Sequence, residues 1–224
     1  FAVTRPAEVA ALKAGDRVKF RLRVSETAAS VEAFEAIGGG SEATKPEPIH
    51  HVILRSQHLR EGDALPDFSL LDETGAPLTA ASLRGKFTVL TFIFSRCPVP
   101  EYCPAMALRF GELQKRILAD PWLAARARLL SVSFDPEFDR PAVLKAYAAA
   151  VGARPAVWQF ATGEREQIDA LTKAFAVFVE RGGVTLNHTL CTALIGPDGR
   201  IVDLWRGNGW RADDVLGAMT RQER

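Results

Sequence analysis

Residues 87–94, FTVLTFIF, restrict the fold of this chain more than any other segment. Side chains of a strand alternate between its two faces, and here both faces are apolar. Such a run is typical of a strand at the centre of a sheet that is covered by helices on both sides. The segment therefore predicts a layered α/β architecture with this strand in its interior.

The segments after this strand alternate between helical and extended patterns. Met106, Phe110, Leu113 and Ile117 recur at helical spacing, and residues 127–134 form a second apolar strand. Further helices are expected over residues 140–152, 164–178 and 211–223, with a short strand and turn in 66–86 and a hairpin over 189–207. This order predicts an α/β sandwich with a mixed central sheet.

The N-terminal region differs in character. Residues 18–24, VKFRLRV, alternate apolar and basic side chains as a half-buried strand does, and a second strand is expected near residues 30–37. Residues 38–48, GGGSEATKPEP, have the composition of a linker. We therefore expect a small partial β-barrel segment over residues 1–37, a linker over 38–60 and the main domain over 61–224.

Composition excludes several classes of function. Apolar residues make up 47% and charged residues 25% of the 224 residues, and the formal net charge of +1 predicts no nucleic-acid or anionic-membrane surface. No run approaches the roughly 20 apolar residues of a membrane span. Because the chain begins at Phe1, we expect a processed or trimmed protein, attached to a membrane only through an anchor that would precede this residue.

The segment SRCPVPEYCP, residues 95–104, holds two of the three cysteines. They can form a structural disulfide, act as a redox pair, or ligate a metal. The loop leaves the carboxyl end of the apolar strand, where open α/β sheets bind ligands. Cys103 precedes Pro104, a residue preferred at the first position of a helix, and a helix N-terminus lowers the pKa of a thiol. This position favours nucleophilic attack or metal ligation.

Two thiolates in a cysteine-poor chain suit copper(I), with zinc a weaker alternative. An imidazole would complete a three-coordinate site. Three of the four histidines, His50, His51 and His58, lie in or beside the expected linker. His188 is instead at the entry to a later apolar strand, so it can meet the cysteine loop at one end of the sheet. Cys191, three residues further on, is expected to be a buried, inert thiol.

Two segments, FDPEFDRPAVLKAYA and NHTLCTALIGPDGR, resemble the Sco/SenC family of copper chaperones, and the similarity extends over residues 61–220. The resemblance implies a thioredoxin-like fold with Cys97, Cys103 and His188 as copper ligands. It also implies that Asp135 tunes the site from beside the ligands. The alternative is that Asp135 serves the turn or helix start at Asp135-Pro136. Members of the family typically have three residues between these cysteines, whereas this chain has five.

The resemblance implies a function as well. It predicts a copper chaperone that delivers copper(I) or copper(II) to a client, such as a cytochrome c oxidase subunit, in the periplasm or another extracytoplasmic space. The Cys97–Cys103 pair would be kept reduced by a thiol–disulfide partner. The alternative is a thiol–disulfide oxidoreductase that acts on client cysteines without a metal. Residues 1–37 resemble the C-terminal part of a CusF-like copper-binding barrel without its metal ligands.

Overall fold

The computed structural model describes residues 2–3, 18–24, 29–36, 58–180 and 186–222. The chain divides into two compact units, Phe1–Arg55 and Ser56–Arg224. In the first unit, β1 (Ala2–Val3), β3 (Ala29–Ala36) and β2 (Val18–Val24) form a three-stranded sheet in that order. Both strands expected in this region are therefore present. The linker residues 38–57 and much of the expected barrel segment lie outside the described residues.

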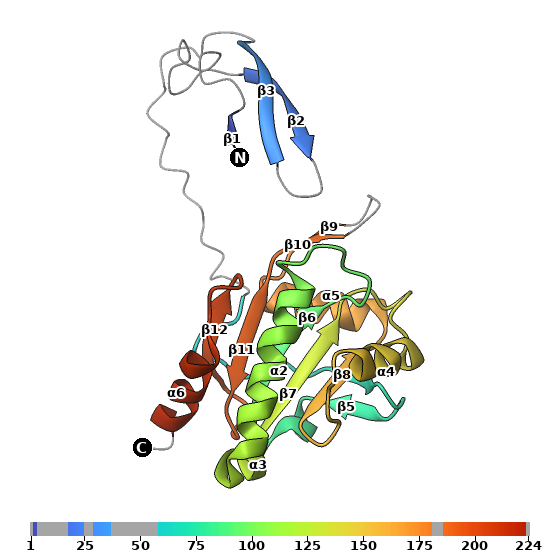
Figure 1. The fold of residues 1–224 in the computed structure, drawn as a ribbon. Helices are drawn as coiled ribbons and strands as arrows, with labels where there is room; N and C mark the ends of the chain where they lie inside the picture. The colour runs from blue at the N-terminus through green and yellow to red at the C-terminus, as the bar shows by residue number, and fades with distance from the viewer. Residues whose placement is uncertain (1, 4–17, 25–28, 37–57, 181–185, 223–224) are drawn as a thin grey trace. The chain divides into compact units, whose positions relative to one another are not determined.

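The second unit is built on a seven-stranded mixed sheet of order β12-β11-β6-β7-β8-β4-β5 (Figure 1). The three parallel central strands are β6 (Phe87–Ile93), β7 (Ala127–Ser133) and β8 (Trp158–Thr162). Antiparallel pairings extend the sheet on both sides through β11 (Cys191–Ile195), β12 (Ile201–Arg206), β4 (Ser69–Asp72) and β5 (Pro77–Thr79). The predicted α/β sandwich with a mixed sheet is confirmed.

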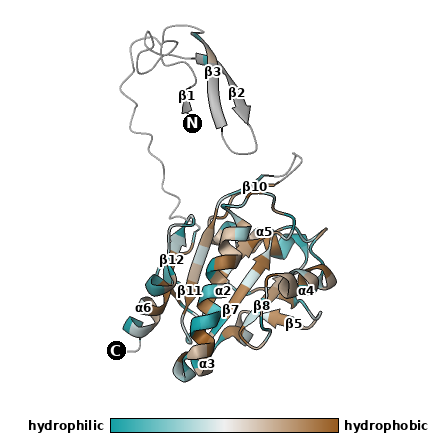
Figure 2. Cartoon of the chain, in the orientation of Figure 1, coloured by the Kyte–Doolittle hydropathy of each residue, from teal (hydrophilic) through white to brown (hydrophobic). Residues whose placement is uncertain are grey.

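Helices cover both faces of this sheet. They are α2 (Cys103–Ala119), α3 (Pro121–Arg126), α4 (Pro141–Ala150), α5 (Arg165–Ala174) and α6 (Ala212–Gln222), with a 3-10 turn at Ala81–Leu83. In Figure 1, α2 and α4 lie in front of the sheet and α5 lies behind it. Figure 2 shows the central strands as largely hydrophobic, whereas α2 also carries hydrophilic residues. This distribution follows from a core between sheet and helices.

Strand β6 is buried on both faces, as its sequence predicts. None of its seven residues is more than 3% exposed. On one face Phe92 packs against Phe175, at the end of α5, with ring centroids 5.3 Å apart. Across the sheet's other face, Phe110 of α2 packs against Trp158 of β8 at 5.6 Å. The packing fixes the carboxyl end of β6, where the cysteine loop begins.

The structure also contains elements that the sequence analysis did not identify. These are α3, β8, and a short antiparallel pair formed by β9 (Val179–Glu180) and β10 (Asn187–His188). Helix α2 begins at Cys103, so Pro104 is its second residue. The sequence had predicted Pro104 as the first residue of this helix. Within the described residues, none of the helices combines the length and the apolar character that crossing a membrane requires.

Candidate metal centre

The two loop cysteines are held by different elements. Cys97 lies four residues beyond the end of β6, in a bend where its N–H donates to the Phe94 carbonyl at 3.3 Å. Cys103 is the first residue of α2 and is fully buried. The first turn of that helix is closed by the Ala105 N–H, which donates to the Pro100 carbonyl at 3.1 Å. The helix therefore fixes one sulfur, and the end of the strand and its loop place the other.

His188 reaches the sulfurs from β10. Its Nδ1 lies 3.2 Å from the Thr189 carbonyl. Because a carbonyl oxygen only accepts hydrogen bonds, Nδ1 donates, and Nε2 of the neutral ring is left with its lone pair. Three aromatic rings surround the imidazole: Phe134 at 4.7 Å, Tyr102 at 5.3 Å and Phe94 at 5.6 Å between centroids. The ring is thus held by packing on several sides.

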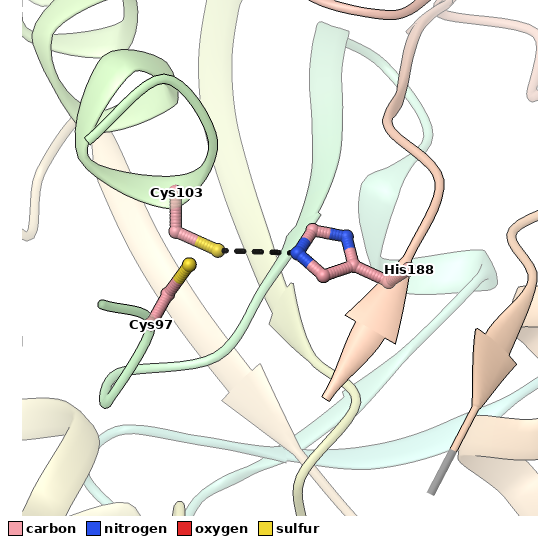
Figure 3. Close-up of side chains that lie close together, drawn as sticks. All are labelled: Cys97, Cys103 and His188. Carbon is pink, nitrogen blue, oxygen red and sulfur yellow. Dashed lines mark hydrogen bonds between the residues drawn. The ribbon is translucent and has the colours of Figure 1, made fainter. Parts of the chain in front are cut away.

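These three side chains converge on one point (Figure 3). The Sγ atom of Cys103 lies 3.9 Å from Nε2 of His188. The two sulfurs and one ring nitrogen all lie within 4.8 Å of one another. All three cysteines of the chain are free thiols. The residues that the sequence analysis selected as ligands are therefore brought together, and they can hold one small, soft ion.

The two thiols have opposite electrostatic environments. A hydrogen bond from the Cys103 thiol is the main cause that lowers the pKa of Cys97. The pKa of Cys103 is raised, because it is the donor in that hydrogen bond and because it is buried. The net shift of the Cys103 pKa is therefore opposite to the one expected from its place at a helix N-terminus, because the hydrogen bond to Cys97 and burial raise it. The first thiolate of the pair forms at Cys97.

Asp135 was expected beside the site, and it lies next to the cysteine loop. It is 4% exposed and accepts a hydrogen bond at 2.8 Å from Nε of Arg96, the residue before Cys97. The Arg96 guanidinium also lies over the ring of Phe138, 4.8 Å from its centroid. Asp135 therefore contacts the loop through Arg96.

A second carboxylate, Asp139, contacts the loop and was not predicted from the sequence. It is completely buried and accepts a hydrogen bond at 2.9 Å from the Ser95 N–H, at the start of the cysteine loop. In the sequence, Asp139 stands two residues before Pro141 and resembles the ordinary polar start of a helix. No local pattern indicates that its partner lies forty-four positions earlier.

Two cavities flank the cluster. One, of about 730 Å³, is lined by His188 and Tyr102 together with His58 and Arg206. The other, of about 470 Å³, is lined by Cys97 and Cys103 together with apolar residues of α2 and α4. The nitrogen side and the sulfur side of the cluster are thus reached through different cavities.

Other candidate residues have separate positions. Cys191 is 1% exposed in β11, and burial raises its pKa to about 11, so it is the buried thiol that the sequence predicted. The Nδ1 atom of His58 lies 2.8 Å from the Lys173 carbonyl. His50 and His51 lie outside the described residues.

A thioredoxin-like α/β fold with two cysteines and a histidine beyond its central strands defines a class of thiol-based redox and soft-metal proteins. Comparison with known proteins identifies the family within that class. The SCO1/SenC family model matches residues 56–222, and the chain belongs to this family.

The relatives include named bacterial and mitochondrial proteins. The SCO1 protein homolog of Bacillus subtilis is 31% identical over 154 residues, which cover 66% of this chain and 77% of that protein. The mitochondrial SCO2 homolog of Mus musculus is 26% identical over 161 residues, covering 69% of this chain. The aligned region spans 60% of that mouse protein, less than two thirds of its length.

Solved structures share the fold. Yeast Sco1 with copper bound is 27% identical and has a TM-score of 0.57, covering 72% of this chain and 88% of that one. BsSco, described as having a disulfide switch and as a member of a family of cytochrome c oxidase assembly proteins, is 26% identical. Its TM-score is 0.61, and the match covers 73% of this chain and 96% of that one.

Proposed function

We propose that this chain is a copper-binding metallochaperone of the Sco/SenC type, with Cys97, Cys103 and His188 as its ligands. The observation that carries the proposal is the convergence of two sulfurs and one imidazole nitrogen within 4.8 Å. Thiolates select copper(I), and imidazole suits copper in either common oxidation state. A copper-bound structure of the related yeast Sco1 supports the same assignment.

Copper is the cargo, and the site suits its transfer. Cys103 and His188 are buried, whereas Cys97 is half-buried, so one ligand can be replaced by a donor from a client. The client is a copper-accepting protein, for which a cytochrome c oxidase subunit is the candidate that the BsSco relative suggests. Copper transfer takes place in the periplasm or another extracytoplasmic space. A lipoprotein and mitochondrial proteins among the relatives support this location.

The division into an N-terminal β segment, a linker and a main domain is part of this proposal. The family match from residue 56 onward supports a main domain that carries the copper site without the N-terminal residues. The N-terminal segment is proposed to derive from a CusF-like barrel, and three described strands support its β character.

A second function is favoured by the free sulfurs and the lowered pKa of Cys97. The Cys97 thiolate attacks a client disulfide, a mixed disulfide forms and one client thiolate leaves. Cys103 then loses its proton and attacks the Cys97 sulfur, which releases the second client thiolate. The client is reduced, the Cys97–Cys103 pair is oxidised, and a thiol reductant partner restores the pair.

Copper titration of the His188→Ala variant tests the proposed function. Competition with a copper(I) chelator should show at least a hundredfold loss of affinity, because a three-coordinate site loses one ligand. The matched control is His58→Ala, which removes another imidazole from the same cavity and should bind as the wild type does. Exchange of the two thiols with a small disulfide should continue in both variants.

Unchanged copper affinity in His188→Ala would show that the imidazole is not a ligand.

A second experiment measures copper(I) binding by the oxidised protein. Copper ligation requires thiolates, so the protein with a Cys97–Cys103 disulfide should bind no copper(I) until it is reduced. Copper uptake by the oxidised form at the wild-type stoichiometry would also contradict the proposal.

A further inference from the structure

Asp139 is a buried carboxylate whose hydrogen bonds all point away from the helix that it precedes. Burial of a charge is costly unless hydrogen bonds compensate it. Its two oxygens accept from the Ser95 N–H at 2.9 Å, from the Ser133 hydroxyl at 2.5 Å, and from the Ser95 hydroxyl. The N-cap of α4 is the following residue, Arg140. Helix capping therefore does not account for this carboxylate.

The two residues that donate hydrogen bonds to Asp139 show which segments it connects. Ser133 is the last residue of β7, and Ser95 lies two residues beyond the end of β6 and two before Cys97. The carboxylate thus joins the ends of two central strands and bonds to both the backbone and the side chain of Ser95. The neighbouring ion pair between Arg96 and Asp135 is weakened by solvent, because the arginine side chain is 52% exposed. The buried hydrogen bonds between Asp139 and Ser95 are therefore the stronger constraint on the loop.

The separation of the two sulfurs depends on this constraint. Cys103 is fixed by α2, a helix of seventeen residues. Cys97 is followed by five residues before that helix, and a loop of this length is compatible with many positions of its sulfur. The position of Ser95 therefore decides where the Cys97 sulfur lies relative to Cys103 and His188.

We propose that Asp139 is a positioning residue, which sets the Cys97 sulfur against Cys103 and His188 by fixing Ser95. It acts through Ser95 and touches neither the sulfurs nor the ion. The copper part of this inference rests on the proposed function. The disulfide part does not, because both copper chelation and disulfide closure need the same proximity of the two sulfurs.

The test compares Asp139→Ala with a buried carboxylate elsewhere in the fold. Asp72 is 9% exposed and accepts hydrogen bonds from the Thr74 N–H and hydroxyl and from the Ala76 N–H. Asp72→Ala therefore removes a comparable set of hydrogen bonds far along the sheet, in the β4–β5 turn. Two site readouts are measured in each variant: copper(I) affinity, by competition with bicinchoninate, and the equilibrium of the Cys97–Cys103 disulfide with a glutathione buffer.

In Asp139→Ala we expect copper(I) affinity to fall at least tenfold and the disulfide equilibrium to shift at least fivefold toward the dithiol. Asp72→Ala should leave both readouts within twofold of the wild type. Asp139→Asn, whose amide can still bond to Ser95, should recover most of both losses. In a double-mutant cycle, Ser95→Ala should have an effect in the wild type and none in Asp139→Ala, because its hydroxyl has lost its acceptor.

The proposal is overturned if folded Asp139→Ala keeps both wild-type readouts, or if Asp72→Ala moves them equally. Should Asp139→Ala fail to fold, Ser95→Ala decides, because it keeps the carboxylate: a threefold or larger loss in both readouts supports the proposal, and no loss overturns it. If the wild type binds no copper, the proposed function fails. The glutathione equilibrium then still decides the role of Asp139.

Discussion

At the scale of single residues, the sulfur pair is asymmetric although both cysteines belong to one loop. Cys97 is half-buried and Cys103 is fully buried. The Cys103 thiol donates to Cys97, which lowers the pKa of Cys97 and raises that of Cys103. Only a thiolate attacks a disulfide or ligates a metal. Accessibility and charge therefore assign the first step of either chemistry to Cys97.

This asymmetry predicts selective alkylation. An ordinary thiol, with a pKa of about 8.5, is almost wholly protonated at about pH 6. Because the pKa of Cys97 is lowered, its thiolate persists in that range, and iodoacetamide should modify Cys97 while Cys103 stays unmodified. Mass spectrometry of the peptides measures both sites across a pH series. Alkylation of Cys103 first, or a Cys97 rate that rises only above about pH 8, would contradict the assignment.

The imidazole depends on its aromatic surroundings. Tyr102 is 38% exposed, and its ring lies edge-on to His188 at 5.3 Å. Aromatic pairs contribute about 0.5–1.5 kcal/mol beyond their burial, so Tyr102→Ala should weaken copper(I) binding about 2- to 10-fold. Tyr102→Phe keeps the ring and should bind as the wild type does. The same chelator competition measures both, and equal losses in the two variants would assign the effect to the hydroxyl.

At the scale of elements, the cysteine loop has five residues between its cysteines and is held at both ends. Ser95 bonds to Asp139 on the strand side, and Cys103 belongs to α2 on the helix side. Pro98, Pro100 and Pro104 restrict the backbone within and after the loop. The ends of the loop, rather than its length, therefore determine where the sulfurs lie.

Shortening the loop tests this view. Deletion of Val99 and Pro100 leaves three residues between the cysteines, with Pro98 in the place of Pro100. The change in the free energy of loop closure is about 0.5 kcal/mol or less. Copper(I) affinity should therefore stay within about threefold of the wild type, as measured by chelator competition. A loss of a hundredfold would mean that the two additional residues themselves shape the site.

The elements that the sequence predicted were those with strong local periodicity. Strand β6 and helix α2 were predicted from their apolar patterns. The connection between them places the cysteine pair beyond the carboxyl end of β6. His188 was found through its chemistry and the family resemblance, because few other soft donors exist in the chain. Its strand β10 has two residues, too few to form a pattern.

The missed residues act through partners distant in sequence. Asp139 bonds to Ser95, and the ring of Tyr102 contacts His188, eighty-six positions away. A single sequence gives the type of each residue and its local pattern but not these pairings. The direction of the sulfur pKa shifts was missed for the same reason, because it depends on which thiol donates to the other.

At the scale of the whole molecule, the site joins parts of the fold that local unfolding would separate. Its three proposed ligands come from the loop after β6, the start of α2, and β10. A ligand that binds only the folded state stabilises it, by about 2.7 kcal/mol at a hundredfold excess over Kd. Copper should therefore stabilise the entire second unit.

Thermal unfolding measures this linkage. Reduced wild-type protein with saturating copper(I) should gain about 5–10 °C in Tm, the shift expected for a unit of this size. His188→Ala and the oxidised protein should gain less than about 2 °C, because neither retains the full set of ligands. An equal gain in His188→Ala would show that copper stabilises the fold from another place.

The division of the chain predicts where this stabilisation is confined. The contacts of the backbone separate Phe1–Arg55 from Ser56–Arg224, and the family match begins at residue 56. All three proposed ligands, and the carboxylates that contact their loop, belong to the second unit. A protein of residues 56–224 should therefore fold, bind one copper(I) ion with an affinity within about twofold of the full chain, and show the same copper-dependent gain in Tm. A tenfold weaker affinity in the well-folded fragment would mean that residues 1–55 contribute to copper binding, because nothing else distinguishes the two proteins.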